Sequence, residues 1–115
     1  MEKYLSNKTQ KSLEELINYI KNSYEYKECI KLKNEINKDK ELMILIDEVR
    51  ICQKNYVKSN YDKDKKSLLD EKVDLLNKNS LYVTYSYYLE QVNEMIKLIK
   101  NELNDYFYEV TNILN

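Results

Sequence analysis

The chain has 115 residues with no glycine, no proline and no histidine, and its 19 basic and 20 acidic residues leave a net charge of −1. The length fits one domain, and the missing glycine and proline are the residues on which tight hairpin turns depend, so a sheet protein is disfavoured. The balanced charge gives no general attraction to nucleic acid or to an anionic membrane, and the absence of histidine removes the commonest general base and metal ligand.

The N-terminal third of the chain predicts two helices. A first helix is expected to begin near Lys8, because apolar residues recur at intervals of three and four at Leu13, Leu16, Ile17 and Ile20. Ser23 is a good N-cap and marks either a kink or a new start. The helical period then resumes at Tyr26, Cys29, Ile30 and Ile36.

The middle of the chain predicts two further helices with a polar interval between them. Asp39 is placed to cap a third helix, whose apolar positions are Leu42, Leu45, Ile46, Val49, Cys52 and Tyr56. Residues 58–67 are almost wholly polar, and we interpret them as a loop or a frayed junction, with a basic contact patch as the alternative. A fourth helix is expected through Leu68, Leu69, Val73 and Leu76.

The last helix carries the strongest pattern in the chain. Asn79 or Ser80 is expected to cap it, and its apolar positions step by three or four through Leu81, Tyr85, Tyr88, Val92, Met95, Ile99, Leu103, Tyr106, Val110 and Ile113. Some 35 helical residues would span about 50 Å, longer than a compact globule of this chain length is wide. A second apolar row follows at Leu89, Ile96, Phe107 and Leu114, and homo-oligomerisation is the simplest way to bury it.

These patterns together predict an all-α bundle of four or five helices with a long C-terminal helix. We expect one helical domain over residues 1–115, with a frayed end at residues 1–8. The longest apolar run, Leu42 to Ile46, is far below the roughly 20 residues of a membrane-spanning helix, and the first ten residues lack the apolar stretch of a signal peptide. A cytoplasmic protein without membrane insertion is therefore expected.

No set of residues predicts a catalytic, cofactor or metal site. Cys29 and Cys52 are expected to be reduced thiols, and two cysteines are too few for an iron–sulfur cluster in one chain, although a cluster shared between subunits stays open. Di-metal bundles pair their acidic ligands with histidine, which is absent here, so the acidic residues are interpreted as solvated faces. We therefore predict that the protein is not an enzyme.

Tyrosine is unusually frequent, with twelve residues in the chain. Tyrosine is common at protein interfaces because its ring buries area while its hydroxyl keeps a polar contact. Core packing is the competing interpretation for Tyr85, Tyr88 and Tyr106, which lie on the apolar stripe of the last helix. The residues predicted for an interaction surface are Tyr82, Tyr87, Met95, Phe107 and Ile113.

The order of several residues resembles that of the YlbF/YmcA family of small helical bacterial regulators. Matching positions lie in the stretch from Asn22 to Gln53 at Ser23, Glu25, Tyr26, Asp39, Glu41 and Gln53. Asn79 and Tyr85 match a later motif, and the resemblance extends from about Leu13 to Ile113. The chain departs from the family pattern at Lys40 and Ser80, where prolines are usual, and at Cys29 and Val49, where aromatic residues are usual.

The resemblance implies a helical dimer or larger oligomer that has no catalytic activity and acts as a regulatory adaptor. It also implies paralogous family members and the RNase Y machinery as partners, and modulation of RNase Y-dependent processing of messenger RNA. Some relatives link extra cysteines to iron–sulfur clusters, but this chain has no cysteine after Cys52. An RNA-binding helical module and a metal-linked or cluster-linked accessory protein remain the alternative interpretations.

Overall fold

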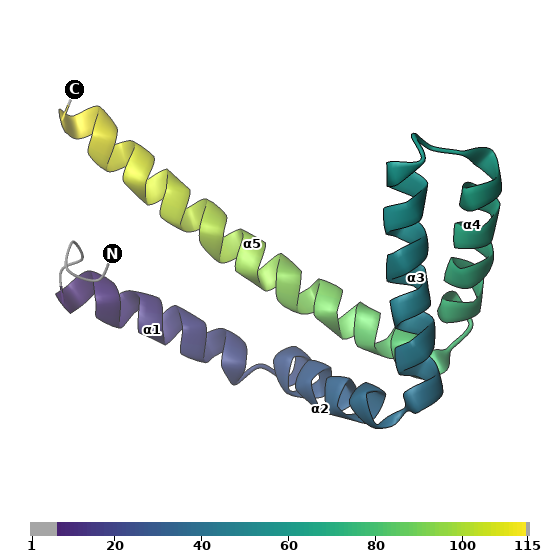
Figure 1. The fold of residues 1–115 in the computed structure, drawn as a ribbon. Coiled ribbons are helices and arrows are strands. Elements are labelled where there is room, and N and C mark those ends of the chain that lie inside the picture. Colours follow the sequence, from purple (N-terminus) through teal and green to yellow (C-terminus); the bar gives the residue numbers. More distant parts are fainter. Residues whose placement is uncertain (1–6, 115) are drawn as a thin grey trace. The chain divides into compact units, whose positions relative to one another are not determined.

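The computed structural model describes residues 7–114, which form five helices without a strand among them (Figure 1). In chain order the helices are α1 (Asn7–Lys21), α2 (Tyr24–Lys38), α3 (Lys40–Lys58), α4 (Lys63–Asn77) and α5 (Ser80–Leu114). The predicted all-α class with a long C-terminal helix is confirmed, since α5 has 35 residues. Within these residues, no helix combines the length and the apolar character that crossing a membrane requires.

A few positions lie outside this description. Residues 1–6 and 115 are not described, nor are the side chains of Thr9, Val110, Ile113 and Leu114. The expected frayed end at residues 1–8 therefore lies largely outside the described residues, whereas Asn7 and Lys8 belong to α1.

The helices fall into two compact units, each described by itself. The terminal unit combines Met1–Glu28 with Tyr88–Asn115, and it contains α1, the start of α2 and most of α5. The central unit is Cys29–Tyr87, and it contains the rest of α2, all of α3 and α4, and the start of α5. The single domain expected from the length stays a prediction.

Three of the helix starts are fixed by short polar side chains. The backbone N–H three residues after each cap donates to its side-chain oxygen, at 3.2 Å for Ser23, 3.1 Å for Asp39 and 3.0 Å for Asn79. Each bond satisfies a backbone donor that has no partner inside the helix. The predicted starts of α2, α3 and α5 are therefore confirmed, with Asn79 rather than Ser80 as the cap of α5.

The loop predicted over residues 58–67 is much shorter in the structure. Lys58 still belongs to α3, and α4 begins at Lys63 after the N-cap Asp62, whose carboxylate accepts from Lys65 N–H at 3.2 Å. The first turns of α4 are exposed on every side, so they carry no apolar period from which a helix could be predicted. A capped and charged helical turn was therefore mistaken for a loop.

The connection between α3 and α4 shows how the chain turns without glycine. Asn60 and Tyr61 have positive φ angles of 59° and 67°. Asn60 N–H donates to Val57 O at 3.2 Å and Tyr61 N–H donates to Tyr56 O at 3.0 Å, which is the hydrogen-bond pattern of a Schellman cap. Asparagine tolerates the left-handed conformation, and the Tyr61 ring makes an edge contact with Tyr56 at 5.3 Å between centroids.

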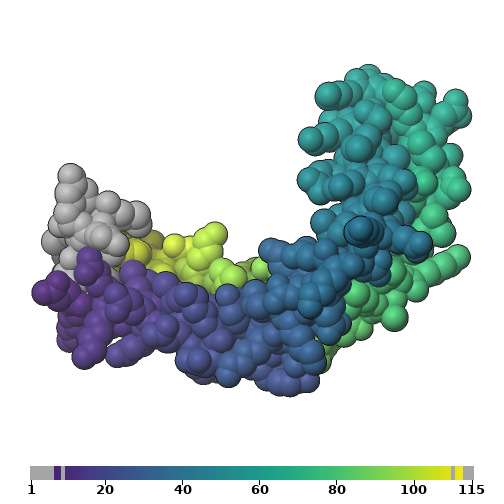
Figure 2. Space-filling model, turned by 60° about the horizontal axis from the view of Figure 1, so that its bottom comes forward, coloured from purple at the N-terminus to yellow at the C-terminus, as the bar shows by residue number. Residues whose placement is uncertain are grey.

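The central unit is held together by a small apolar core. Leu42 is almost fully buried, and it clusters with Ile36 from α2, Val49 from α3 and Leu76 from α4. Partly buried side chains surround this cluster: Met43, Leu45, Ile46, Leu69, Val73, Leu81, Tyr82 and Tyr85. The helices α3 and α4 lie side by side in both views (Figures 1 and 2), so each covers one stripe of the other and leaves its opposite side exposed.

Two valines of α3 test this core. Val49 is 8% exposed and Val57 is 58% exposed, while both lie in the same helix and gain the same helical propensity on mutation to alanine. We expect Val49→Ala to lower the free energy of unfolding by about 2 kcal/mol, from two lost methyl groups and a small cavity. Val57→Ala should stay within about 0.5 kcal/mol of the wild type in urea unfolding. Equal losses for the two variants would contradict the core as described.

Candidate interaction surface

Helix α5 has one apolar face that is largely covered in the structure. On this face Val92 is buried, and its neighbours at helical spacing are half-buried, namely Tyr88, Met95, Ile99 and Leu103. The predicted apolar stripe is therefore confirmed over this part of the helix. Beyond it, Tyr106 is exposed, and the side chains of Val110 and Ile113 lie outside the described residues.

A second apolar row of α5 is exposed. Leu89, Ile96 and Phe107 are 36%, 43% and 51% exposed, and we call these three residues the outer row. Separations of seven and eleven residues return to nearly the same direction on an α-helix, so the three side chains form one line beside the covered stripe. The terminal unit thus leaves a row of three apolar side chains on α5 exposed.

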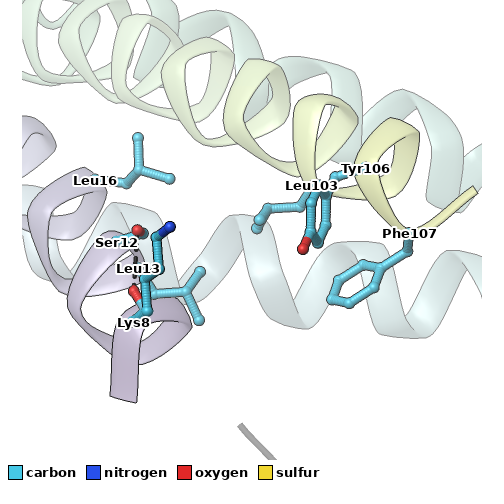
Figure 3. A pocket seen from close by; sticks show the side chains of 7 residues that line it. All are labelled: Lys8, Ser12, Leu13, Leu16, Leu103, Tyr106 and Phe107. Carbon is cyan, nitrogen blue, oxygen red and sulfur yellow. Dashed lines mark hydrogen bonds between the residues drawn. The ribbon is translucent and has the colours of Figure 1, made fainter. Parts of the chain in front are cut away.

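An apolar hollow adjoins the outer row near the chain ends. It has a volume of about 450 Å³ and is lined from α1 by Lys8, Ser12, Leu13 and Leu16, and from α5 by Leu103, Tyr106 and Phe107 (Figure 3). Ser12 Oγ donates to Lys8 O at 3.0 Å, so that hydroxyl is already engaged within α1. The walls are mainly apolar, and they extend the surface that begins with the outer row.

Tyrosines join α5 to the start of α2 within the terminal unit. The rings of Tyr24 and Tyr88 meet edge to face with 5.9 Å between centroids. A hydrogen bond to Tyr24 raises the pKa of the Tyr88 hydroxyl, and burial and the nearby carboxylates of Glu25 and Glu28 act in the same direction. Tyr88 is therefore a packing residue of this unit, in line with the core interpretation of the tyrosines on the stripe.

Comparison with known proteins decides the family. A family model described as "Control of competence regulator ComK, YlbF/YmcA" matches residues 10–113. The chain belongs to the YlbF/YmcA family. This family is linked to the regulation of competence, and its members are regulators that are generally not enzymes. No curated protein and no solved structure matches the chain.

The residues on which the YlbF/YmcA resemblance was based have a largely local role in this structure. Ser23, Asp39 and Asn79 are the N-caps of α2, α3 and α5. Tyr85 is packed against the core of the central unit, where burial raises the pKa of its hydroxyl and the neighbouring Cys29 and Tyr82 add to the effect. These four positions therefore set where three helices of this YlbF/YmcA protein begin and how α5 packs in the central unit.

The five residues predicted for an interaction surface are spread over both units. In the central unit, Tyr82 packs against the core and Tyr87 is exposed. In the terminal unit, Met95 is half-buried on the covered stripe, and Phe107 is exposed in the outer row. The side chain of Ile113 lies outside the described residues. The structure thus joins Phe107 to Leu89 and Ile96, which the apolar pattern showed but the predicted site residues did not include.

Further exposed aliphatic residues lie outside the outer row, and two of them, Ile17 and Leu68, had been expected on the apolar stripes of their helices. Leu98 is 63% exposed on the opposite side of α5 from Ile96, and Ile17 is exposed on α1. In the central unit, α3 exposes Ile44 and Ile51, while α4 exposes Leu68 and Leu75. Ile44 and Ile51, like Leu68 and Leu75, are seven residues apart, and this spacing indicates a shared side of each helix.

The two cysteines of this YlbF/YmcA protein differ in environment. Both are free thiols, with Cys29 buried and Cys52 partly exposed. Burial raises the pKa of the Cys29 thiol, against a smaller opposite effect of Lys33. Among the described residues, no group of three or more cysteine or acidic side chains is arranged to hold a metal ion.

Alkylation distinguishes the two thiols. Because the thiolate is the reacting form, burial and a raised pKa should make Cys29 react several-fold more slowly than Cys52 with iodoacetamide at pH 8. The difference should shrink as the pH rises toward the pKa of Cys29 and vanish in urea, as measured by peptide mass spectrometry. Equal rates in the folded protein would show that Cys29 is accessible and would contradict the structure.

Proposed function

We propose that this protein is a non-catalytic regulatory adaptor that acts by binding other proteins through the outer row of α5. The exposed line of Leu89, Ile96 and Phe107 is the observation that supports this role, because it lies beside a stripe that is already covered. A row of exposed apolar side chains on one side of a helix is typical of an interaction surface. The family's link to regulation supports the same conclusion.

The first partner proposed for this surface is another copy of the chain. Pairing two copies through the same row gives a closed contact in which each copy buries the apolar strip of the other. Paralogous family members would present a related helix, so they are the second class of partner. The net charge of −1 gives no support to RNA binding by the isolated chain.

The regulatory outcome proposed for these contacts is modulation of RNase Y-dependent processing of messenger RNA in the cytoplasm. The support for it is the family, whose regulators are linked to competence. In this role the chain contributes binding and positioning, while a partner enzyme performs the chemistry.

Self-association through the outer row is tested by a matched pair of variants. Ile96 and Leu98 are both exposed aliphatic residues of α5, at 43% and 63%, but they point to opposite sides of the helix. We expect Ile96→Lys to weaken self-association at least about tenfold in sedimentation velocity, because a lysine in an apolar contact must be desolvated without a partner. Leu98→Lys should associate like the wild type, and circular dichroism confirms that both variants are folded.

The wild type, Ile96→Lys and Leu98→Lys then serve as baits for affinity capture from a native cytosolic extract. We expect the wild type and Leu98→Lys to recover family paralogues or components of the RNase Y machinery, and Ile96→Lys to recover them poorly. Identical recovery by all three baits would show that the outer row is not the binding surface. If the wild-type bait captures only further copies of itself, the protein is a homo-oligomer and the proposed role in RNA processing is withdrawn.

A further inference from the structure

One face of the α3–α4 hairpin repeats the same three-residue pattern on both helices. Glu48 of α3 and Lys72 of α4 form an ion pair, with 3.0 Å between Oε2 and Nζ. On each helix the charged residue is preceded by an aliphatic residue four positions earlier and followed by one three positions later. We call the six residues the hairpin face: Ile44, Glu48 and Ile51 from α3, and Leu68, Lys72 and Leu75 from α4.

The spacing places all six residues on one side of the hairpin. Residues three and four apart are neighbours on a helix surface, so Ile44 and Ile51 flank Glu48, while Leu68 and Leu75 flank Lys72. The ion pair shows that Glu48 and Lys72 lie on the same side of the hairpin. Four aliphatic side chains therefore surround one ion pair that crosses the two helices.

These aliphatic residues are not part of the core. Ile44 and Ile51 are 59% and 56% exposed, and Leu68 and Leu75 are each 47% exposed. The buried Leu42 and Val49 lie on the opposite side of α3 from Ile44 and Ile51, whereas Leu68 and Leu75 lie to one side of the buried Leu76 on α4. Single exposed aliphatic residues are common, but an ordered group of four on two packed helices forms a patch that resembles an interface.

The charges of the hairpin face suit a second copy of the same face. The Glu48 and Lys72 side chains are 43% and 28% exposed, so this pair contributes little to the fold by itself. A face with one positive and one negative group at its centre is complementary to itself for one orientation of a two-fold axis. With the axis parallel to the helices, each Glu48 lies opposite the Lys72 of the other copy, whereas an axis across the helices would oppose like charges.

We propose that the hairpin face binds the hairpin face of a second copy, with α3 of each copy packed on α4 of the other. The four aliphatic side chains of each copy would be buried around a quartet of alternating charges. This contact lies in the central unit and goes beyond the outer row of α5, which lies in the terminal unit. A chain with both contacts would form assemblies larger than a dimer.

Two charge-reversed variants test the contact when they are mixed. Glu48→Lys makes both central charges positive, and Lys72→Glu makes both negative, so each variant should repel its own copies. A mixture of the two restores opposite charges across the contact, although neither chain regains its internal ion pair. If Glu48 and Lys72 interacted only within one chain, mixing the two variants would therefore not restore association.

The experiment is carried out in the Ile96→Lys background, so that the outer row does not contribute and the result is independent of the proposed function. In sedimentation velocity at low salt, we expect Ile96→Lys alone to form a dimer through the hairpin face. Each charge-reversed variant should be monomeric, and their equimolar mixture should associate at least about tenfold more tightly than either alone. Added salt should weaken the mixed dimer.

A second ion pair provides the matched control. Asp47 and Arg50 also form an exposed pair, with 2.6 Å between Oδ1 and Nη2, but this pair runs along α3 and not across the hairpin. Mixing Asp47→Lys with Arg50→Glu should give no gain over either variant alone. The proposal is overturned if Ile96→Lys is monomeric at every accessible concentration, or if the Glu48 and Lys72 variants associate no better mixed than apart.

Discussion

Burial of Leu42 is the constraint on which the central unit depends. Side chains from α2, α3, α4 and the start of α5 meet around it, and they include Ile36, Val49 and Leu76 as the other buried members of the cluster. Each helix supplies only one apolar stripe to this core, because about three or four residues in every two turns face the same way. The sides of α3 and α4 that point away from the core must therefore remain exposed or be covered by another molecule.

The same limit applies to the terminal unit, where the apolar surface of α5 is wider than the part that is covered. Val92 and its half-buried neighbours satisfy one stripe, and Leu89, Ile96 and Phe107 remain outside it. The hollow beside Phe107 leaves further apolar surface open near the chain ends. Both units thus combine a small covered core with an ordered apolar surface, as expected for a protein that works through contacts with other chains.

Polar side chains decide where the helices begin and end in a chain that lacks glycine and proline. Ser23, Asp39, Asp62 and Asn79 accept backbone hydrogen bonds at the starts of four helices, and Asn60 takes the left-handed position at the end of α3. These are short-range interactions, so most of them could be predicted from local sequence. Asp62 was missed because the turns that follow it carry no apolar residue to mark a helix.

The sequence by itself determined the helical class, the length of α5, three of the helix caps and the position of a second apolar row on α5, because helical periodicity and capping act over only a few residues. Only the tertiary structure decided which apolar residues are covered. Tyr82 and Met95 were predicted to lie in an interaction surface, yet they are partly covered within the chain, whereas Leu89 and Ile96 are left exposed beside Phe107. The pairing of Glu48 with Lys72 across the hairpin also depends on how α3 packs on α4. Burial and cross-helix contacts join residues far apart in the chain, and periodicity along one helix carries no information about its neighbour.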